Sequence, residues 1–239
     1  MLKVFRKRSK RRKRPAEFVE VEGPWDEAAK RHEVQGWDTG SCLEFVTRST
    51  SKTEERWAGG QVHEPVTAAL HAAASMLSNG ENSVLDYGGG LGVYRHIVSR
   101  ALPGVVLDYH VAEVPVVAEH GSKHVPGVTF WGDDGFDDRR FSMVMALGSA
   151  HTSPDWRAML RRLAGVTDRV LHIQLPLADK ERLLLGSGWE TKFLAWALPR
   201  EELVAEVERT GFKLSWWCTV GAVAVGEGTL ARGAFTFVR

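Results

Sequence analysis

From residue 83 onward, short apolar runs alternate with segments whose apolar residues recur at helical spacing. The apolar runs are expected to be buried strands and cover residues 83–87, 105–111, 128–131, 141–147 and 169–175. The segments between them, 93–102, 114–119 and 154–164, place their apolar residues on one helical face. Strands that alternate with helices in this way predict a parallel sheet with helices on both faces.

The C-terminal part of the chain departs from this alternation. Residues 200–210 form an amphipathic pattern that ends at Gly211, as a helix does. Two apolar runs, 213–219 and 233–238, then follow without a helix between them, which predicts an antiparallel hairpin at the sheet edge. The expected fold is a doubly wound, Rossmann-like α/β domain with seven mostly parallel strands and an antiparallel C-terminal hairpin.

The first third of the chain has weaker periodicity than the rest, and this difference divides the whole chain into three regions. Residues 1–15 are expected to be a basic, disordered tail, residues 16–80 a helical and loop extension, and residues 81–239 the main domain. The extension contains Trp25, Trp37 and Trp57 and one clear helical pattern over residues 63–77. It either covers a binding site as a lid or packs on the main domain.

Charge is distributed unevenly along the 239 residues. Residues 3–14 hold nine basic side chains and no acid, so the rest of the chain has 31 − 9 = 22 basic against 30 acidic residues, or −8. The tail either binds phosphate-rich partners such as nucleic acid or anionic lipid, or is simply solvated. Because no basic surface accompanies it in the acidic body, nucleic-acid binding is not favoured.

Several classes of protein are disfavoured by composition. No apolar run reaches the roughly 20 residues that span a bilayer, and no apolar segment follows the basic N-terminus as in a secretory signal. The two cysteines, Cys42 and Cys218, form neither a disulfide framework nor a metal-ligand motif, and the histidines are scattered. We expect a cytoplasmic protein without a structural metal.

A glycine cluster directly follows the first strand of the regular region. Asp86 is followed by four glycines, Gly88, Gly89, Gly90 and Gly92. The dinucleotide fingerprint G-x-G-x-x-G fails, because it requires glycine where Val93 or Arg95 stands. The pattern present is D-x-G-x-G-x-G, at the strand end where doubly wound sheets bind their ligands. Glycines there let the backbone turn sharply and approach a ligand closely.

This motif resembles the first motif of the class I S-adenosyl-L-methionine-dependent methyltransferases, and the resemblance extends from residue 82 to the C-terminus. It implies S-adenosyl-L-methionine as cofactor, with Asp86 near its methionine amino group and the glycines beside its ribose. It further implies that Glu113, with Asp108 as the rival, binds the ribose hydroxyls, and that Asp133 or Asp134 binds the adenine amino group. Each acid taken alone is equally compatible with a turn or surface position.

A narrower resemblance is carried by LDYGGGLG, by AEVP and by LGSAHTSPDW after the fourth strand. These phrases are similar to a group of bacterial methyltransferases found in surface-polysaccharide or natural-product gene clusters. The chain departs from that group at Ala150 and His151, where the group carries a longer polar-aromatic phrase.

Candidate catalytic residues lie beyond the fourth strand, where the family places acceptor-side groups. His151 and Asp155 are the candidates for deprotonating an acceptor, with a substrate contact or a plain loop residue as the alternatives for His151. His172 lies in the apolar run of the fifth strand and is interpreted as a core residue. Residues 186–196 are expected to overhang the acceptor site, with aromatic side chains that either line a pocket or pack in the core.

These features favour methyl transfer to a small-molecule or glycan acceptor, with oxygen preferred over nitrogen. Two alternatives remain open: a methyltransferase that holds nucleic acid or protein through the basic tail, and a catalytically inactive domain of the same fold. The N-P-P-[FY] phrase of many enzymes that methylate nucleic-acid or protein nitrogens is absent after the fourth strand, which counts against the first alternative.

Overall fold

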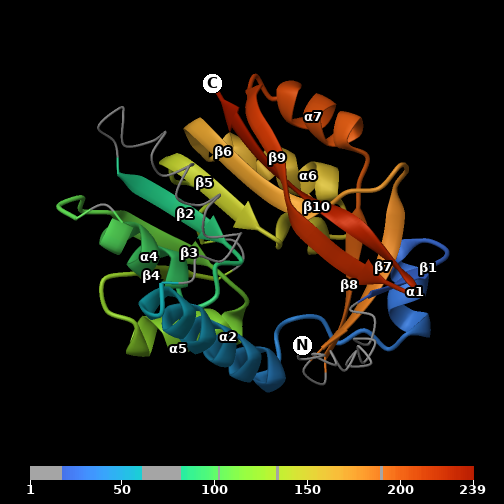
Figure 1. The fold of residues 1–239 in the computed structure, drawn as a ribbon, viewed down its shortest axis with the longest axis horizontal. Coiled ribbons are helices and arrows are strands. Elements are labelled where there is room, and N and C mark those ends of the chain that lie inside the picture. Colours follow the sequence, from blue (N-terminus) through green and yellow to red (C-terminus); the bar gives the residue numbers. More distant parts are fainter. Residues whose placement is uncertain (1–17, 61–81, 102, 133–134, 189–190) are drawn as a thin grey trace, which may run out of the picture.

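The computed structural model describes residues 18–60, 82–101, 103–132, 135–188 and 191–239 (Figure 1). The strands are β1 (Phe18–Val21), β2 (Ser83–Tyr87), β3 (Asp108–Ala112), β4 (Thr129–Trp131), β5 (Phe141–Leu147), β6 (Thr167–Pro176), β7 (Arg182–Gly188), β8 (Thr191–Ala197), β9 (Lys213–Val225) and β10 (Gly228–Val238). The helices are α1 (Trp25–Arg31), α2 (Gly40–Ala58), α4 (Val93–Ala101), α5 (Pro115–His124), α6 (Trp156–Gly165) and α7 (Arg200–Glu208), with a short 3-10 turn, η1 (Ala150–Thr152).

All the described strands belong to one sheet with the order β4-β3-β2-β5-β6-β10-β9-β1-β7-β8. The five strands from β4 to β6 are mutually parallel, and β10 pairs antiparallel with both β6 and β9. From β2 the chain proceeds outward to β3 and β4, then returns to β5 on the other side of β2. The carboxyl ends of β2 and β5 therefore form the switch point at which such sheets bind ligands.

The doubly wound α/β fold and its antiparallel C-terminal hairpin are confirmed, but the expected seven strands were too few. The additional strands are β1, β7 and β8, which extend the sheet beyond β9. Phe18 of β1 pairs with Gly186 of β7 and with Val225 of β9, and Leu184 pairs with Ala195. The apolar runs Leu183–Leu185 and 193–197 carry a strand signal, which the expectation that residues 186–196 overhang the acceptor site did not use.

Two hydrophobic layers cover the faces of the central strands, because successive residues of a strand point to opposite faces. Strand β5 shows this directly: Val144 and Ala146 pack in the layer that contains residues of α6 and α7, whereas Met143 and Met145 pack in the layer that contains Val98 of α4. His172, on β6, is fully buried and its Nδ1 lies 2.9 Å from the Thr236 hydroxyl on β10. Its position agrees with its interpretation as a core histidine.

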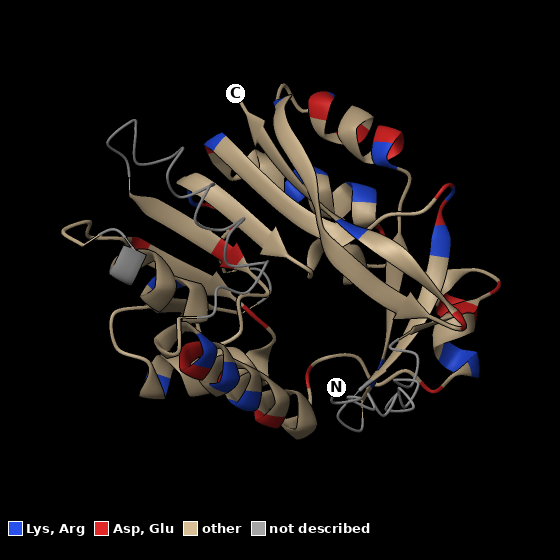
Figure 2. Ribbon diagram, in the orientation of Figure 1, with Lys and Arg blue, Asp and Glu red and all other residues tan. Residues whose placement is uncertain are grey.

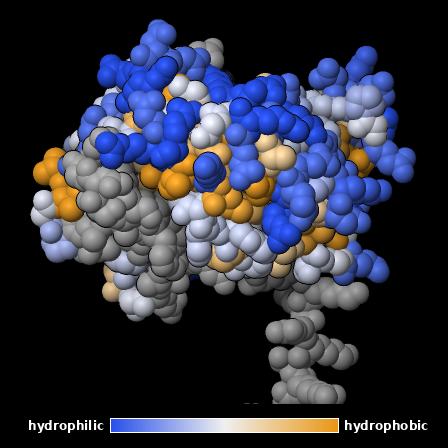
Figure 3. Space-filling model, turned by 90° about the horizontal axis from the view of Figure 1, so that it is seen from above, coloured by the Kyte–Doolittle hydropathy of each residue, from blue (hydrophilic) through white to orange (hydrophobic). Residues whose placement is uncertain are grey.

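Charged residues lie mostly on the helices and loops, and the inner strands carry few of them (Figure 2). Seen from above, hydrophobic residues form small separate areas among hydrophilic ones (Figure 3). Among the described helices, none combines the length and apolar character needed to cross a bilayer. The basic tail, the helix expected over residues 63–77, and both Asp133 and Asp134 lie outside the described residues.

Candidate active site

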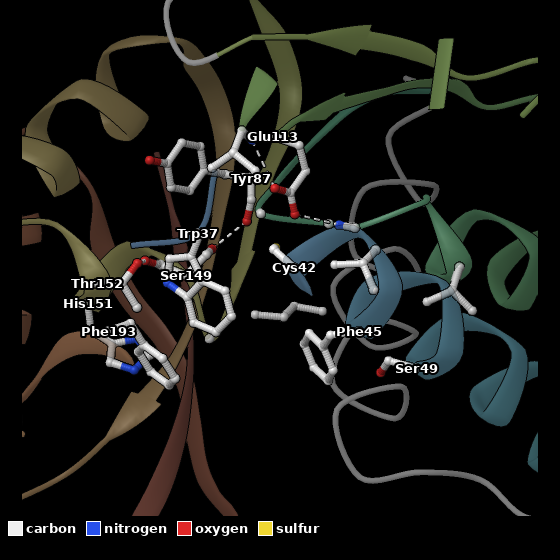
Figure 4. A pocket seen from close by; sticks show the side chains of 18 of the residues that line it. Trp37, Cys42, Phe45, Ser49, Tyr87, Glu113, Ser149, His151, Thr152 and Phe193 are labelled. Atoms are coloured by element: carbon white, nitrogen blue, oxygen red, sulfur yellow. Dashed lines mark hydrogen bonds between the residues drawn. The ribbon is translucent and has the colours of Figure 1, made fainter. Parts of the chain in front are cut away.

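A pocket of about 370 Å³ opens at the switch point, within the range of roughly 300–1,000 Å³ typical of ligand sites. The strand ends supply one side of it, through residues that follow β2, β3 and β5. Helix α2 supplies the opposite side: Cys42, Phe45 and Ser49 face the pocket across from Glu113 and Ser149 (Figure 4). The N-terminal extension thus forms a wall of the pocket.

The glycine loop lines this pocket through Gly88, Gly89 and Gly90, and each glycine has a local reason. Gly88 has φ +68°, and a Cβ there would lie 2.3 Å from Cβ of Ser149. A Cβ on Gly89 would lie 2.3 Å from Cγ of Asp86, and one on Gly90, whose φ is +61°, would lie 3.0 Å from Cγ1 of Val46. Gly88 and Gly89 let the loop backbone pack closely against the side chains of Ser149 and Asp86. Gly90 presents bare backbone between α2 and the pocket.

Glu113 follows the last residue of β3 and lies at the pocket's edge, as the resemblance implied. Its Oε1 accepts a hydrogen bond from the Gly90 N–H at 2.9 Å, and its Oε2 accepts one from the Val114 N–H at 3.0 Å. Asp108 begins the same strand, at the end remote from the pocket, and lies 3.0 Å from Nε2 of His110. The backbone therefore fixes Glu113, and not Asp108, beside the glycine loop.

The Glu113 carboxylate can also receive a ligand. An ionised carboxylate has two acceptor oxygens with about four lone-pair sites, which suits a pair of adjacent hydroxyl groups. The backbone holds both oxygens of Glu113 at the pocket's edge, and the bare backbone of Gly90 lies next to them. This arrangement fits the ribose of an adenosyl cofactor.

Asp86 lies beneath the glycine loop and does not line the pocket, which differs from its expected place beside the cofactor's amino group. Its side chain is fully buried, and its Oδ2 accepts a 2.7 Å hydrogen bond from the Tyr109 hydroxyl. Its Oδ1 has no partner among the described residues. Burial, and to a smaller extent the charge of Glu113, raises the pKa of Asp86 to about 7, although the Tyr109 hydrogen bond opposes the shift.

This raised pKa predicts that stability falls as pH rises. The folded state binds a proton at Asp86 up to about pH 7, whereas the unfolded state releases it near 3.8, so the contribution is greatest at low pH and is lost by about pH 7. In urea unfolding, we expect the wild type to lose about 3 kcal/mol more than Asp86→Asn between pH 5 and pH 8. Asp138→Asn, at an exposed position, should follow the wild type. Parallel curves for wild type and Asp86→Asn would contradict the prediction.

Of the two acceptor-side candidates, the structure brings only His151 to the pocket. His151 is 5% exposed, lines the cavity from η1, and its Nδ1 has no partner among the described residues. Burial, and then the charge of Arg232, lowers the pKa of His151 to about 3, so the imidazole is neutral at physiological pH. Asp155 does not line the pocket; its carboxylate accepts a 2.9 Å hydrogen bond from the Ala158 N–H and caps α6.

Phe18 and Arg232 line the pocket but were not identified from the sequence, whereas Trp37 and Phe193 fall in segments for which a pocket role was left open. Trp37 and Phe193 meet with ring centroids 4.2 Å apart, and Phe18 meets Phe193 edge-on at 5.7 Å. Arg232 of β10 also lines the cavity. The two described aromatic residues of 186–196 divide between the two roles left open: Phe193 lines the pocket, whereas Trp196 packs on Trp25 with centroids 5.8 Å apart.

No protein-family model matches the sequence, and no curated protein matches it significantly. Among solved structures, the 1,6-didemethyltoxoflavin N1-methyltransferase of Burkholderia thailandensis, with bound 1,6-didemethyltoxoflavin and S-adenosylhomocysteine, has a TM-score of 0.55 at 17% identity over 93% of this chain and 94% of that one.

Two further structures agree with it. An S-adenosylmethionine-dependent methyltransferase of Clostridium acetobutylicum has a TM-score of 0.55 at 8% identity, over 80% of this chain and 98% of that one. The mitomycin 7-O-methyltransferase MmcR has a TM-score of 0.52 at 21% identity, over 82% of this chain and 60% of that one. The chain has the class I methyltransferase fold.

Proposed function

We propose that this protein is an S-adenosyl-L-methionine-dependent methyltransferase that acts on a small-molecule acceptor, with oxygen favoured over nitrogen as the methylated atom. The observation that carries the proposal is the position of Glu113. Its carboxylate is held against Gly90 at the edge of a pocket at the switch point of a class I methyltransferase fold.

The cofactor half of the pocket lies at the ends of β2 and β3. Glu113 would accept hydrogen bonds from the ribose hydroxyls, and Ala112 and Val114, on either side of it, would supply apolar contact. When bound, S-adenosyl-L-methionine supplies a methyl group activated by its sulfonium. The protein's task is then to align the acceptor and to exclude water.

The acceptor half lies beyond the glycine loop, where His151 and Thr152 meet aromatic residues. His151 lines this half with a neutral imidazole, which would accept the hydrogen bond of an acceptor hydroxyl and receive its proton as the oxygen–methyl bond forms. The aromatic surface suits a ring-shaped acceptor, aromatic or sugar. Helix α2 and the aromatic residues of β1 and β8 line the pocket as well, which favours a small acceptor over nucleic acid or protein.

Calorimetry with S-adenosylhomocysteine tests the proposal directly. We expect one binding site per chain, with an affinity in the micromolar range or tighter, and release of S-adenosylhomocysteine from S-adenosyl-L-methionine when an acceptor is supplied. A folded protein that gives no heat with S-adenosylhomocysteine would refute the proposal. Binding without turnover on any acceptor would support the inactive-domain alternative.

A further inference from the structure

Arg232 brings a positive charge to the pocket, and no carboxylate of the described residues pairs with it. Its side chain is half-buried and lines the cavity, and it makes no hydrogen bond or ion pair with any described residue. Other arginines on the same domain behave differently: Arg157 contacts Glu181 and Glu202, and Arg161 contacts Glu206. A half-buried guanidinium without a partner is costly unless a ligand supplies the missing anion.

A backbone irregularity occurs beside Arg232. In the pairing of β10 with β9, Ala231 lies opposite Ala222, but Gly233 lies opposite Thr219, so the register shifts at Arg232. The strand β9 carries the extra residue there, and Gly221 adopts φ +131°. Bulges of this kind redirect side chains and are frequent beside functional sites.

Two aromatic residues of the pocket come from strands that lie beyond β10 in the sheet order, in the same half of the sheet as Arg232. Phe18 of β1 and Phe193 of β8 lie on the strands that extend the sheet beyond β9, and Trp37 packs on Phe193. Trp37 and Phe193 remain partly exposed at the pocket. Aromatic faces of this kind favour contact with a planar ring.

The charges of the pocket are segregated. Among the lining residues that the structure describes, Glu113 and Arg232 carry a formal charge at neutral pH, since the pKa of Cys42 is raised to about 12 by burial and His151 is neutral. Strands β3 and β10 are four steps apart in the sheet, or roughly 19 Å along it at ~4.8 Å per strand. The negative group therefore lies in the cofactor half and the positive group in the acceptor half.

We propose that Arg232 binds the carboxylate of a planar aromatic acceptor whose ring lies against Trp37 and Phe193. This inference rests on the proposed methyltransferase function and specifies its acceptor class. Binding of such a carboxylate would also change the pKa of His151. A carboxylate on Arg232 cancels part of the guanidinium's field, so it raises the pKa of His151 and makes this imidazole a better proton acceptor.

Calorimetry on the protein saturated with S-adenosylhomocysteine tests the inference. The probes are 2-, 3- and 4-hydroxybenzoate and 4-hydroxycinnamate, each paired with its neutral methyl ester. We expect at least one acid to bind about tenfold or more tightly than its ester, because only the acid forms a charge-assisted hydrogen bond with the guanidinium. Arg232→Gln should abolish this preference, Arg232→Lys should keep part of it, and Arg48→Gln, exposed on α2 outside the pocket lining, should keep all of it.

The outcomes separate the two proposals. Failure of the folded wild type to bind S-adenosylhomocysteine refutes the methyltransferase function itself. Normal binding of S-adenosylhomocysteine, combined with esters that bind as well as acids or with no acid binding at all, refutes only the role of Arg232. A tenfold loss of S-adenosylhomocysteine affinity in Arg232→Gln would also overturn it, because Arg232 would then serve the cofactor's own carboxylate.

Discussion

Replacement of Glu113 by alanine is expected to weaken the binding of S-adenosylhomocysteine about 100-fold. Glu113 supplies two carboxylate oxygens that the Gly90 and Val114 N–H groups already hold in place, so a ligand diol meets a preorganised acceptor. Two hydrogen bonds to a charged group together contribute about 3 kcal/mol, and each 1.4 kcal/mol is tenfold in affinity. Isothermal titration calorimetry at constant salt measures the change.

Two further variants separate ligand binding from folding in that experiment. Glu119→Ala removes an exposed carboxylate of α5 that does not line the pocket, and it should bind like the wild type. Glu113→Gln keeps one acceptor oxygen and should lie between wild type and Glu113→Ala. If Glu113→Ala is folded, as judged by its thermal unfolding, and binds S-adenosylhomocysteine within threefold of the wild type, the assignment of the cofactor half is wrong.

His151→Ala is expected to lower kcat about 100-fold and to leave the affinity for S-adenosylhomocysteine within about threefold. A positioned general base contributes roughly 10²–10⁴-fold, and His151 faces the acceptor half of the pocket. The measurement is the rate of S-adenosylhomocysteine release with any acceptor that the wild type turns over. His96→Ala, which removes an exposed histidine of α4, is the matched control and should retain full activity.

The pH profile provides a second readout for His151. Burial and the nearby charge of Arg232 lower the pKa of His151 to about 3, so the free enzyme keeps this imidazole neutral at any pH above that value. A group whose pKa is depressed loses its neutral form only as pH falls through the lowered pKa. We therefore expect no decrease of kcat/KM attributable to His151 between pH 8 and pH 5. A decrease near pH 6.5 that disappears in His151→Gln would contradict the structure.

Much of the cofactor half was predictable because its signals are local. The strand 83–87 and the strand 141–147 have the predicted boundaries, and their carboxyl ends meet as the alternating pattern requires. The glycine loop and Glu113 each follow directly from a strand end, so their proximity depends only on adjacent parallel strands. Asp86 was placed on the correct strand, but its burial under the loop depends on Tyr109 from the neighbouring strand.

Apart from His151, the acceptor half could not be predicted, because it is assembled by pairings between distant parts of the chain. Phe18 reaches the pocket only because β1 pairs with Gly186 and Val225, more than 160 residues later. Arg232 is directed by a shift of register, which leaves no periodic signal in the sequence. The sequence position of Asp155 suggested a catalytic role, but its carboxylate caps helix α6.

The amino-acid sequence by itself determined that this protein has a doubly wound α/β domain with a glycine loop and an acid at neighbouring strand ends. Local periodicity and loop composition predict these features, because each of them depends on only a few consecutive residues. The tertiary structure alone decided which aromatic and cationic groups share the pocket with His151. Their meeting depends on long-range strand pairing and burial, which are properties of the whole folded chain.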